Sequence, residues 1–197
     1  MKFVLASHNA HKLAEMQQIL PAQGIEVVLQ SELGMNIDVE ESGETFLENA
    51  RLKAVAVMQA SGLPAIADDS GLCVDCLNGA PGVYSARYGG EALSDKERYE
   101  LLLGLTAGQL QRSARFVSAI VCALPNGDLV EAEGSCEGTL AYAPRGEGGF
   151  GYDPVFFVPE LKKTFAQLTA EEKNEVSHRA NALRKFQQAW QDYQAKH

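Results

Sequence analysis

Three short segments of the chain combine residue types that could act on a phosphate. The first, Ser7-His-Asn-Ala-His-Lys12, ends in a cation, and the second, Asp68-Asp69-Ser70-Gly71, places two carboxylates side by side. The third, residues 173–179, carries two cations, a serine and a histidine. Lysine and arginine bind phosphate oxygens, and carboxylates hold hard divalent cations. Together these segments suggest chemistry on a phosphate compound.

The first segment lies between an expected strand at residues 2–7 and an expected helix that ends at Pro21. Free N–H groups and the dipole at a helix N-terminus favour an anion, and Lys12 would add a positive charge. The alternative is an ordinary helix cap by Ser7 or Asn9 with a solvated Lys12. This segment alone leaves both open.

The paired carboxylates of Asp68 and Asp69 follow a short expected strand at residues 65–67. Two carboxylates at a strand end can hold Mg²⁺, which takes only one or two protein carboxylates and keeps several waters. The alternative is a turn in which an aspartate caps its own backbone. Glu40 and Glu41 are further acidic candidates, although charged residues usually face solvent.

The third segment falls on an expected C-terminal helix that starts near Ala170. Lys173 and Ser177 are four residues apart and share a helical face, whereas His178 and Arg179 point at adjacent angles. These side chains converge fully only if a turn interrupts the helix.

A glycine-rich stretch, Gly146-Glu-Gly-Gly-Phe-Gly151, has the letters of a dinucleotide-binding fingerprint. That fingerprint must open a helix, but this stretch runs into Pro154 and a β-type run at residues 154–158. We interpret it as a loop near a site.

The remaining patterns predict the elements that position these segments. They are strands at residues 25–29, 115–124 and 129–140, with Pro125-Asn-Gly-Asp128 as a hairpin turn, and helices that start after Thr45 and at Asp95. Helices and strands alternate first and a long hairpin follows. The fold class predicted is therefore α/β, with a mixed, elongated sheet flanked by helices and two lobes that share the sheet.

Composition limits the partners. The chain has 197 residues, 46% of them hydrophobic, and a formal net charge of −9. A nucleic-acid polymer or an anionic membrane would need a broad basic field, so both are disfavoured. The longest apolar run, residues 116–124, is too short to cross a bilayer, and no secretory signal is seen. We expect a cytoplasmic protein. If its ligand carries phosphate, the protein must bind it with a few local cations or a metal ion rather than with its overall field.

Four cysteines add little to this interpretation. Cys73 and Cys76 have the spacing of half a zinc or redox site, but Cys122 and Cys136 supply no second close pair. We expect buried, reduced thiols.

Taken together, the motifs resemble, nearly end to end, a known family: the house-cleaning pyrophosphatases of purine nucleoside triphosphates. The segments that carry the resemblance are Ser7-His-Asn-Ala-His-Lys12, Glu40-Glu-Ser-Gly-Glu-Thr-Phe-Leu-Glu-Asn-Ala50 with Lys53, Ala67-Asp-Asp-Ser-Gly-Leu72, Gly79-Ala-Pro-Gly-Val-Tyr-Ser-Ala-Arg-Tyr88, Gly149-Phe-Gly-Tyr-Asp-Pro154 and Ser177-His-Arg179. One departure is that Ser7-His8 stands where the family usually has Thr-Gly.

The resemblance implies one pyrophosphatase domain over residues 1–197, with a substrate cleft between its lobes. The enzyme would hydrolyse dITP, ITP and XTP to the monophosphate and pyrophosphate, which keeps deaminated bases out of DNA and RNA. Mg²⁺ would be held by Asp69 and Glu40, and water would attack the α-phosphorus. Asp69 would act as the general base or mainly as a metal ligand that positions the water.

The resemblance also implies the residues that bind the substrate. Around the phosphates these are Asn9, Lys12 and Lys53. Further substrate-binding residues are Ser7, His8, Ala10, His11 and Ser70. For the base they are Phe150 as a stacking surface, with Gly151, Tyr152, Asp153, Lys173, Ser177, His178 and Arg179 around it. A homodimer is expected from the family. The alternatives are a non-catalytic nucleotide-binding or sensor module and a pyrophosphatase for another modified nucleotide.

Overall fold

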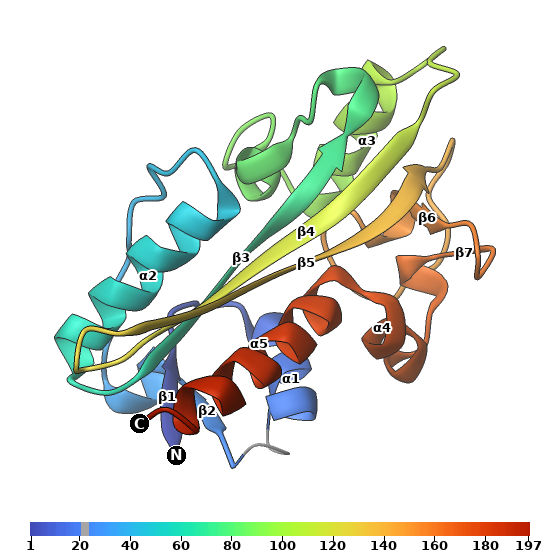
Figure 1. Cartoon of the computed structure of the whole chain (residues 1–197). Helices are drawn as coiled ribbons and strands as arrows, with labels where there is room; N and C mark the ends of the chain where they lie inside the picture. The colour runs from blue at the N-terminus through green and yellow to red at the C-terminus, as the bar shows by residue number, and fades with distance from the viewer. Residues whose placement is uncertain (21–23) are drawn as a thin grey trace. The chain divides into compact units, whose positions relative to one another are not determined.

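The computed structural model describes residues 1–20 and 24–197 and contains a seven-stranded sheet with helices against it (Figure 1). The strand order is β2-β1-β3-β4-β5-β6-β7. β1 pairs in parallel with β2 and β3, whereas β5 and β6, and β6 and β7, pair antiparallel. The predicted α/β class with a mixed sheet is therefore confirmed.

The strands are β1 (Lys2–Leu5), β2 (Glu26–Leu29), β3 (Ala65–Val74), β4 (Ser113–Ala123), β5 (Leu129–Leu140), β6 (Phe156–Val158) and β7 (Lys163–Thr164). The α-helices are α1 (Ala10–Ile19), α2 (Phe46–Ser61), α3 (Asp95–Leu105), α4 (Ala170–Val176) and α5 (His178–Gln194). Short 3-10 helices occur at Gln30–Leu33, Asp75–Leu77, Gly82–Arg87, Asp153–Val155 and Phe165–Gln167.

Local signals explain the elements that were predicted well. Thr45 caps α2 by accepting a hydrogen bond from the Glu48 N–H, and Gly62 ends the helix in the left-handed region. Helix α3 begins at Asp95 and ends at Leu105, and β4 and β5 flank the predicted hairpin turn. Pro21, the predicted end of the first helix, lies outside the described residues.

Three expected boundaries were wrong. The strand at residues 65–67 continues through both aspartates as the ten-residue β3, because each carboxylate finds a cation inside the fold. The C-terminal helix is interrupted at Ser177, whose backbone is extended, so α4 and α5 are separate helices. The β-type run at residues 154–158 begins as a 3-10 helix, since Pro154 cannot donate to a sheet.

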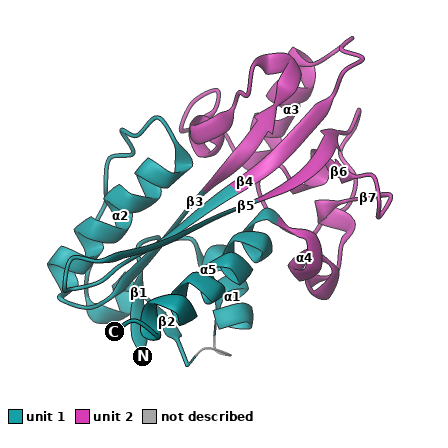
Figure 2. Ribbon diagram, viewed as in Figure 1, with its two compact units in different colours: residues 1–69, 118–134, 178–197 teal, residues 70–117, 135–177 magenta. Residues whose placement is uncertain are grey.

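The chain divides into two compact units (Figure 2). Unit 1 contains residues 1–69, 118–134 and 178–197, and unit 2 contains residues 70–117 and 135–177. In unit 1, α1 and α5 lie side by side and α2 lies across the sheet from them (Figure 2). Strands β3, β4 and β5 each contribute residues to both units.

Each unit has its own apolar core. In unit 1, Phe3 of β1 meets Trp190 of α5 edge to face, with ring centroids 5.2 Å apart. In unit 2, Phe116 stacks on Phe165 at 5.5 Å, and Phe156 meets both rings edge to face. Such pairs contribute about 0.5–1.5 kcal/mol beyond the area that they bury. Among the described residues, no helix is long and apolar enough to cross a membrane.

Candidate active site

The first feature of the site is the buried carboxylate of Asp68, in the middle of β3. The side chain is fully buried, and it accepts hydrogen bonds from the Ser118 hydroxyl at 2.5 Å and from Arg179 Nη2 at 2.9 Å. Lys12 Nζ lies 2.8 Å from the same carboxylate. Burial opposes ionisation, but the charges of Arg179 and Lys12 outweigh it and hold the pKa of Asp68 well below its usual range.

Arg179 donates hydrogen bonds to two carboxylates of this cluster. It is 1% exposed, and its guanidinium also donates to the carboxylate of Glu15 on α1. Burial alone would favour the neutral form, but Asp68 and Glu15 raise the pKa of Arg179. The sequence interpretation placed Arg179 around the base, whereas the structure assigns its donors to two carboxylates.

Asp69 points to the other face of β3 and meets a different cation. Its Oδ1 accepts from Lys53 Nζ at 2.7 Å. Its Oδ2 is buried and has no hydrogen-bond partner among the described residues. Burial raises the pKa of Asp69, and Lys53 offsets this only in part. An ionised oxygen left without a partner inside a protein is costly, so this atom is a candidate ligand or proton acceptor.

Lys53 joins Asp69 to the acidic segment, residues 38–44. Its ammonium group donates to Glu41 Oε1 at 2.8 Å. Burial opposes the charged form, but the Asp69 and Glu41 carboxylates outweigh it and raise the pKa of Lys53. Glu40, the acidic residue implied by the resemblance, is exposed, whereas its neighbour Glu41 lies in the cluster. Adjacent glutamates cannot be told apart by a sequence pattern.

Lys12 and the turn before it resolve the two alternatives for the first segment. Asn9 caps α1 by accepting from the N–H groups of His11 and Lys12, and the Ser7 hydroxyl accepts from Asn9 N–H. The Lys12 side chain is only 14% exposed, so it is not a solvated lysine. Burial lowers the pKa of Lys12, which Asp68 offsets in part. The Asn9 cap and a largely buried Lys12 are therefore both present. His8, Ala10 and His11 of the same segment are exposed.

Sequence reasoning missed two members of this cluster, Ser118 and Glu15. Ser118 is fully buried in β4, where it donates to Asp68. A single hydroxyl inside the apolar run of residues 116–124 is the signal that could have found it. No local signal marks Glu15, which lies on a helix with many polar residues.

A second cluster of predicted residues lies in unit 2. Lys173 Nζ is 2.7 Å from Asp153 Oδ2, and it lies 5.2 Å from the centroid of the Phe150 ring. The same Asp153 oxygen accepts from Phe150 N–H at 3.0 Å. Gly149 makes this possible: its φ is +74°, and a Cβ there would come within 2.0 Å of that oxygen. A cation, a carboxylate and a partly exposed aromatic ring are thus held together.

Other residues predicted around the base have different surroundings. Tyr152 is buried, and its hydroxyl donates to the Ser85 carbonyl at 2.8 Å. Gly151 N–H donates to Asp95. Ser177 is buried in unit 2, whereas His178 is buried at the start of α5 in unit 1. Ser70, predicted to bind the substrate, is partly buried on β3 in unit 2.

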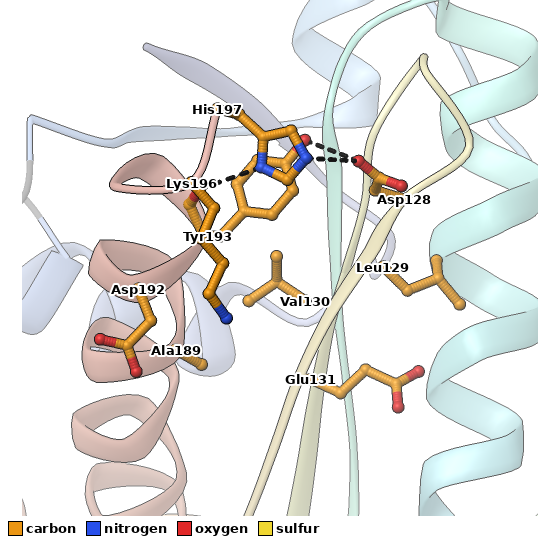
Figure 3. A pocket seen from close by; sticks show the side chains of 9 residues that line it. All are labelled: Asp128, Leu129, Val130, Glu131, Ala189, Asp192, Tyr193, Lys196 and His197. Atoms are coloured by element: carbon orange, nitrogen blue, oxygen red, sulfur yellow. Dashed lines mark hydrogen bonds and ion pairs between the residues drawn. The ribbon is translucent and has the colours of Figure 1, made fainter.

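A groove of about 470 Å³ lies elsewhere in unit 1, along the last turns of α5 and the start of β5 (Figure 3). Tyr193 at its rim donates to the Asp128 carboxylate at 2.9 Å and stacks on His197. None of the predicted site residues lines this groove. It is therefore separate from the clusters described above.

The four cysteines differ in their exposure. All four are free thiols; Cys122 and Cys136 are buried, and Cys73 and Cys76 are partly exposed. Burial raises the pKa of Cys136 to about 11, so its thiol is protonated and unreactive at neutral pH. Within residues 1–20 and 24–197, no group of three or more histidine, cysteine, aspartate or glutamate side chains could hold a metal ion alone.

The sequence matches the model of the Ham1 family over residues 3–189. It is 49% identical over 186 residues to the dITP/XTP pyrophosphatase of Treponema denticola, an alignment that covers 93% of this chain and 95% of that protein. It is 51% identical over 195 residues to a dITP/XTP pyrophosphatase of Thermus thermophilus, covering 98% and 93%.

Solved structures are also similar to this chain. The Ham1 protein of Staphylococcus aureus superposes with a TM-score of 0.89 at 44% identity, covering 98% of this chain and all of that one. A HAM1 protein from Coxiella burnetii gives a TM-score of 0.89 at 43% identity, covering 98% and 99%.

Proposed function

The chain belongs to the Ham1 family, and we propose on that premise that it is a pyrophosphatase of deaminated purine nucleoside triphosphates. It hydrolyses dITP, ITP and XTP to the monophosphate and pyrophosphate, and so removes them from the nucleotide pool. The observation that carries the proposal is the cluster of Lys12, Lys53 and Asp69. The two largely buried ammonium groups both contact the Asp68 carbonyl, Lys53 also contacts Asp69 Oδ1, and Asp69 Oδ2 has no partner among the described residues.

We assign the triphosphate to the cations of unit 1. The ammonium groups of Lys12 and Lys53 can donate to phosphate oxygens, and the capped N-terminus of α1 at Asn9 favours negative charge. Asp68 and Arg179 support this role, because their buried ion pair holds Lys12 in place. These local charges let a protein with a net charge of −9 bind a polyanion.

The residues of the cluster fit a magnesium ion. Asp69 Oδ2 is an unpartnered oxygen ligand, and a second carboxylate lies close by, because Asp69 and Glu41 contact the same ammonium group. Mg²⁺ needs only one or two protein carboxylates when the substrate supplies phosphate oxygens. We therefore propose Asp69 and Glu41 as the ligands, in preference to Glu40. When bound, the ion would neutralise charge on the phosphoryl oxygens.

We assign the activation of water to Asp69. Its buried carboxylate has a raised pKa, so it is a stronger base than an exposed aspartate. The water oxygen forms a bond to the α-phosphorus, the bond from that phosphorus to the bridging oxygen breaks, and pyrophosphate leaves. The proton of the water passes to the Asp69 carboxylate, which otherwise serves as the metal ligand that positions the water. Lys53 donates to Oδ1 and so keeps the carboxylate oriented.

Base recognition is assigned to the cluster of unit 2, with Phe150 as the stacking surface and Lys173 and Asp153 as polar contacts. Hypoxanthine and xanthine share a 6-oxo group that a hydrogen-bond donor of the site would recognise. Arg179 is not that donor, since it already serves Asp68 and Glu15. Adenine presents an amino group there and would leave such a donor unpaired. A mismatch of this kind can reduce kcat/KM by factors of roughly 10⁴.

Three further properties belong to the same proposal: the chain acts as one domain over residues 1–197, as a homodimer, in the cytoplasm. A panel of nucleotides with Mg²⁺ and identified products tests the function. We expect pyrophosphate from dITP, ITP and XTP far faster than from ATP. Release of orthophosphate would contradict the proposal, and tight binding without turnover would indicate a sensor module instead.

A further inference from the structure

Gln30, at the end of β2, makes a two-point contact with the chain that leads to the acidic segment. Its side-chain Oε1 accepts from Ile37 N–H at 2.9 Å, and its Nε2 donates to the Ile37 carbonyl at 3.0 Å. Its own carbonyl accepts from Met35 N–H at 3.0 Å. Gln30 is 1% exposed, and its bonds to Ile37 are partly buried. The Gln30 amide thus pairs with both backbone groups of Ile37, as a neighbouring strand would do.

The same amide also reaches the turn before α1. Gln30 Nε2 lies 3.2 Å from His8 Nε2. Because Ile37 N–H fixes Oε1 as the acceptor, Nε2 must be the donor toward both Ile37 and His8. His8 Nε2 is then the acceptor of this contact. One side chain joins the turn at residues 7–12 to the acidic segment.

The other end of the acidic segment is fixed on α2. Asn49, which is fully buried, accepts from Gly43 N–H at 2.8 Å through Oδ1. A Cβ on Gly43 would come within 2.7 Å of that oxygen, so the contact requires glycine. Lys53, one helical turn after Asn49, holds Glu41. Glu41 therefore lies between an anchor at Ile37 and an anchor at Gly43.

We propose that Gln30 is a positioning residue of the active site: it holds Ile37 and His8 together, and so sets the Glu41 carboxylate beside Lys53 and Asp69. This inference rests on the proposed function, because its effect on the reaction passes through Glu41. Removing the amide takes these partners from the N–H and C=O of Ile37, which are partly buried. The backbone of the acidic segment then keeps only the anchor at Gly43, and the Glu41 side chain keeps its contact with Lys53.

The test uses Gln30→Leu, which keeps the bulk of the side chain and removes all three of its hydrogen bonds. Gln187→Leu is the matched control, because the Gln187 amide also donates to a backbone carbonyl, that of Ile19, at 2.9 Å, away from the acidic segment. Val57→Ala controls for lost stability, since Val57 is buried in α2 and makes no part of the site.

Two readouts are compared in each variant. One is amide hydrogen exchange at Ile37, Ser42 and Gly43, which needs no substrate. The other is kcat/KM for dITP together with the Mg²⁺ concentration that gives half-maximal activity. Mutation of a residue that contacts a metal ligand commonly lowers metal affinity or activity by roughly 10–100-fold. We expect Gln30→Leu to speed exchange, lower kcat/KM by about 10-fold or more and raise the Mg²⁺ requirement, with both controls close to the wild type.

Unchanged exchange in Gln30→Leu, or faster exchange with unchanged kinetics, overturns the proposal. So does an equal rise in the Mg²⁺ requirement in either control. If the wild-type protein releases no pyrophosphate, the proposed function fails, and the assignment of Gln30 to its reaction fails with it. The exchange data then still show whether Gln30 holds the segment, which separates the two failures.

Discussion

The ammonium groups of Lys12 and Lys53 donate to one shared acceptor, the backbone carbonyl oxygen of Asp68, at 3.0 and 3.3 Å. Two like charges this close repel each other, and Lys53 is one of the groups that lower the pKa of Lys12. The carboxylates of Asp68 and Asp69, one on each face of β3, compensate them. A single strand thus places two cations where a polyphosphate could replace the shared carbonyl contacts.

Asp69→Asn tests the role of the unpartnered carboxylate oxygen. The amide cannot accept the proton of the water and is a poor magnesium ligand, so kcat should fall by roughly 10²–10⁴. Substrate binding should largely survive, because Lys12 and Lys53 remain. Steady-state kinetics and equilibrium binding of dITP measure the two effects. Asp192→Asn on the exposed face of α5 is the control, and activity of Asp69→Asn within a few-fold of it would refute the assigned role.

Lys12→Met removes the cation but keeps the length of its side chain. A charge-assisted hydrogen bond is worth about 1.5–3 kcal/mol, which corresponds to a rise of roughly 10–150-fold in KM for the triphosphate. The change in KM for dITP, measured beside inhibition by the monophosphate product, checks this. Lys2→Met on the exposed end of β1 serves as the control. A fall in kcat with an unchanged KM would place Lys12 in the chemical step instead.

Acid should weaken the contribution of Asp68 to stability. Because its pKa is lower in the folded protein, this contribution is fully present above the unfolded pKa of about 3.9 and is lost as the pH falls toward the folded pKa. Asp68→Asn leaves Arg179 buried beside a neutral amide, so we expect a loss of about 3–5 kcal/mol in the free energy of unfolding at pH 7.

Urea unfolding of both proteins at several pH values between 7 and 3 checks this prediction. The gap between wild type and Asp68→Asn should narrow below about pH 3.9, because only the wild type has a carboxylate to protonate there. A gap of the same size at pH 3 and pH 7 would show that Asp68 is not the titrating group.

Gly149→Ala should damage base recognition in unit 2. The new Cβ would lie within 2.0 Å of Asp153 Oδ2, so the carboxylate must leave either Lys173 or the Phe150 N–H. The preference for dITP over ATP, taken as the ratio of kcat/KM values, should fall. Gly108→Ala is the matched control, because Gly108 has a similar φ of +78° but nothing within 4 Å of a new Cβ. Equal effects in both variants would mean that backbone strain alone is responsible.

The elements predicted correctly from the sequence are those whose formation is decided by neighbouring residues. The cap at Thr45, the hairpin turn at Asn126-Gly127 and the start of α3 at Asp95 are decided by neighbouring residues, and all three were predicted correctly. The continuation of β3 through Asp68 was not. It depends on Lys12 and Arg179, which lie 56 and 111 residues away along the chain.

The same limit applies to the candidate site. The residue types of Lys12, Lys53 and Asp69 marked them as phosphate and metal candidates, and the fold brings these three together. The choice between Glu40 and Glu41 depends on how Gln30 and Asn49 hold the acidic segment. Those anchors come from two different elements, so no spacing in the sequence shows them.

Hydrolysis in water enriched in ¹⁸O tests the central claim most directly, because it identifies the phosphorus atom that is attacked. With dITP and Mg²⁺, mass spectrometry of the products should find one ¹⁸O atom in the monophosphate and none in the pyrophosphate. Label in the pyrophosphate, or release of labelled orthophosphate, would show attack on another phosphorus and would contradict the assignment of water activation to Asp69 at the α-phosphorus.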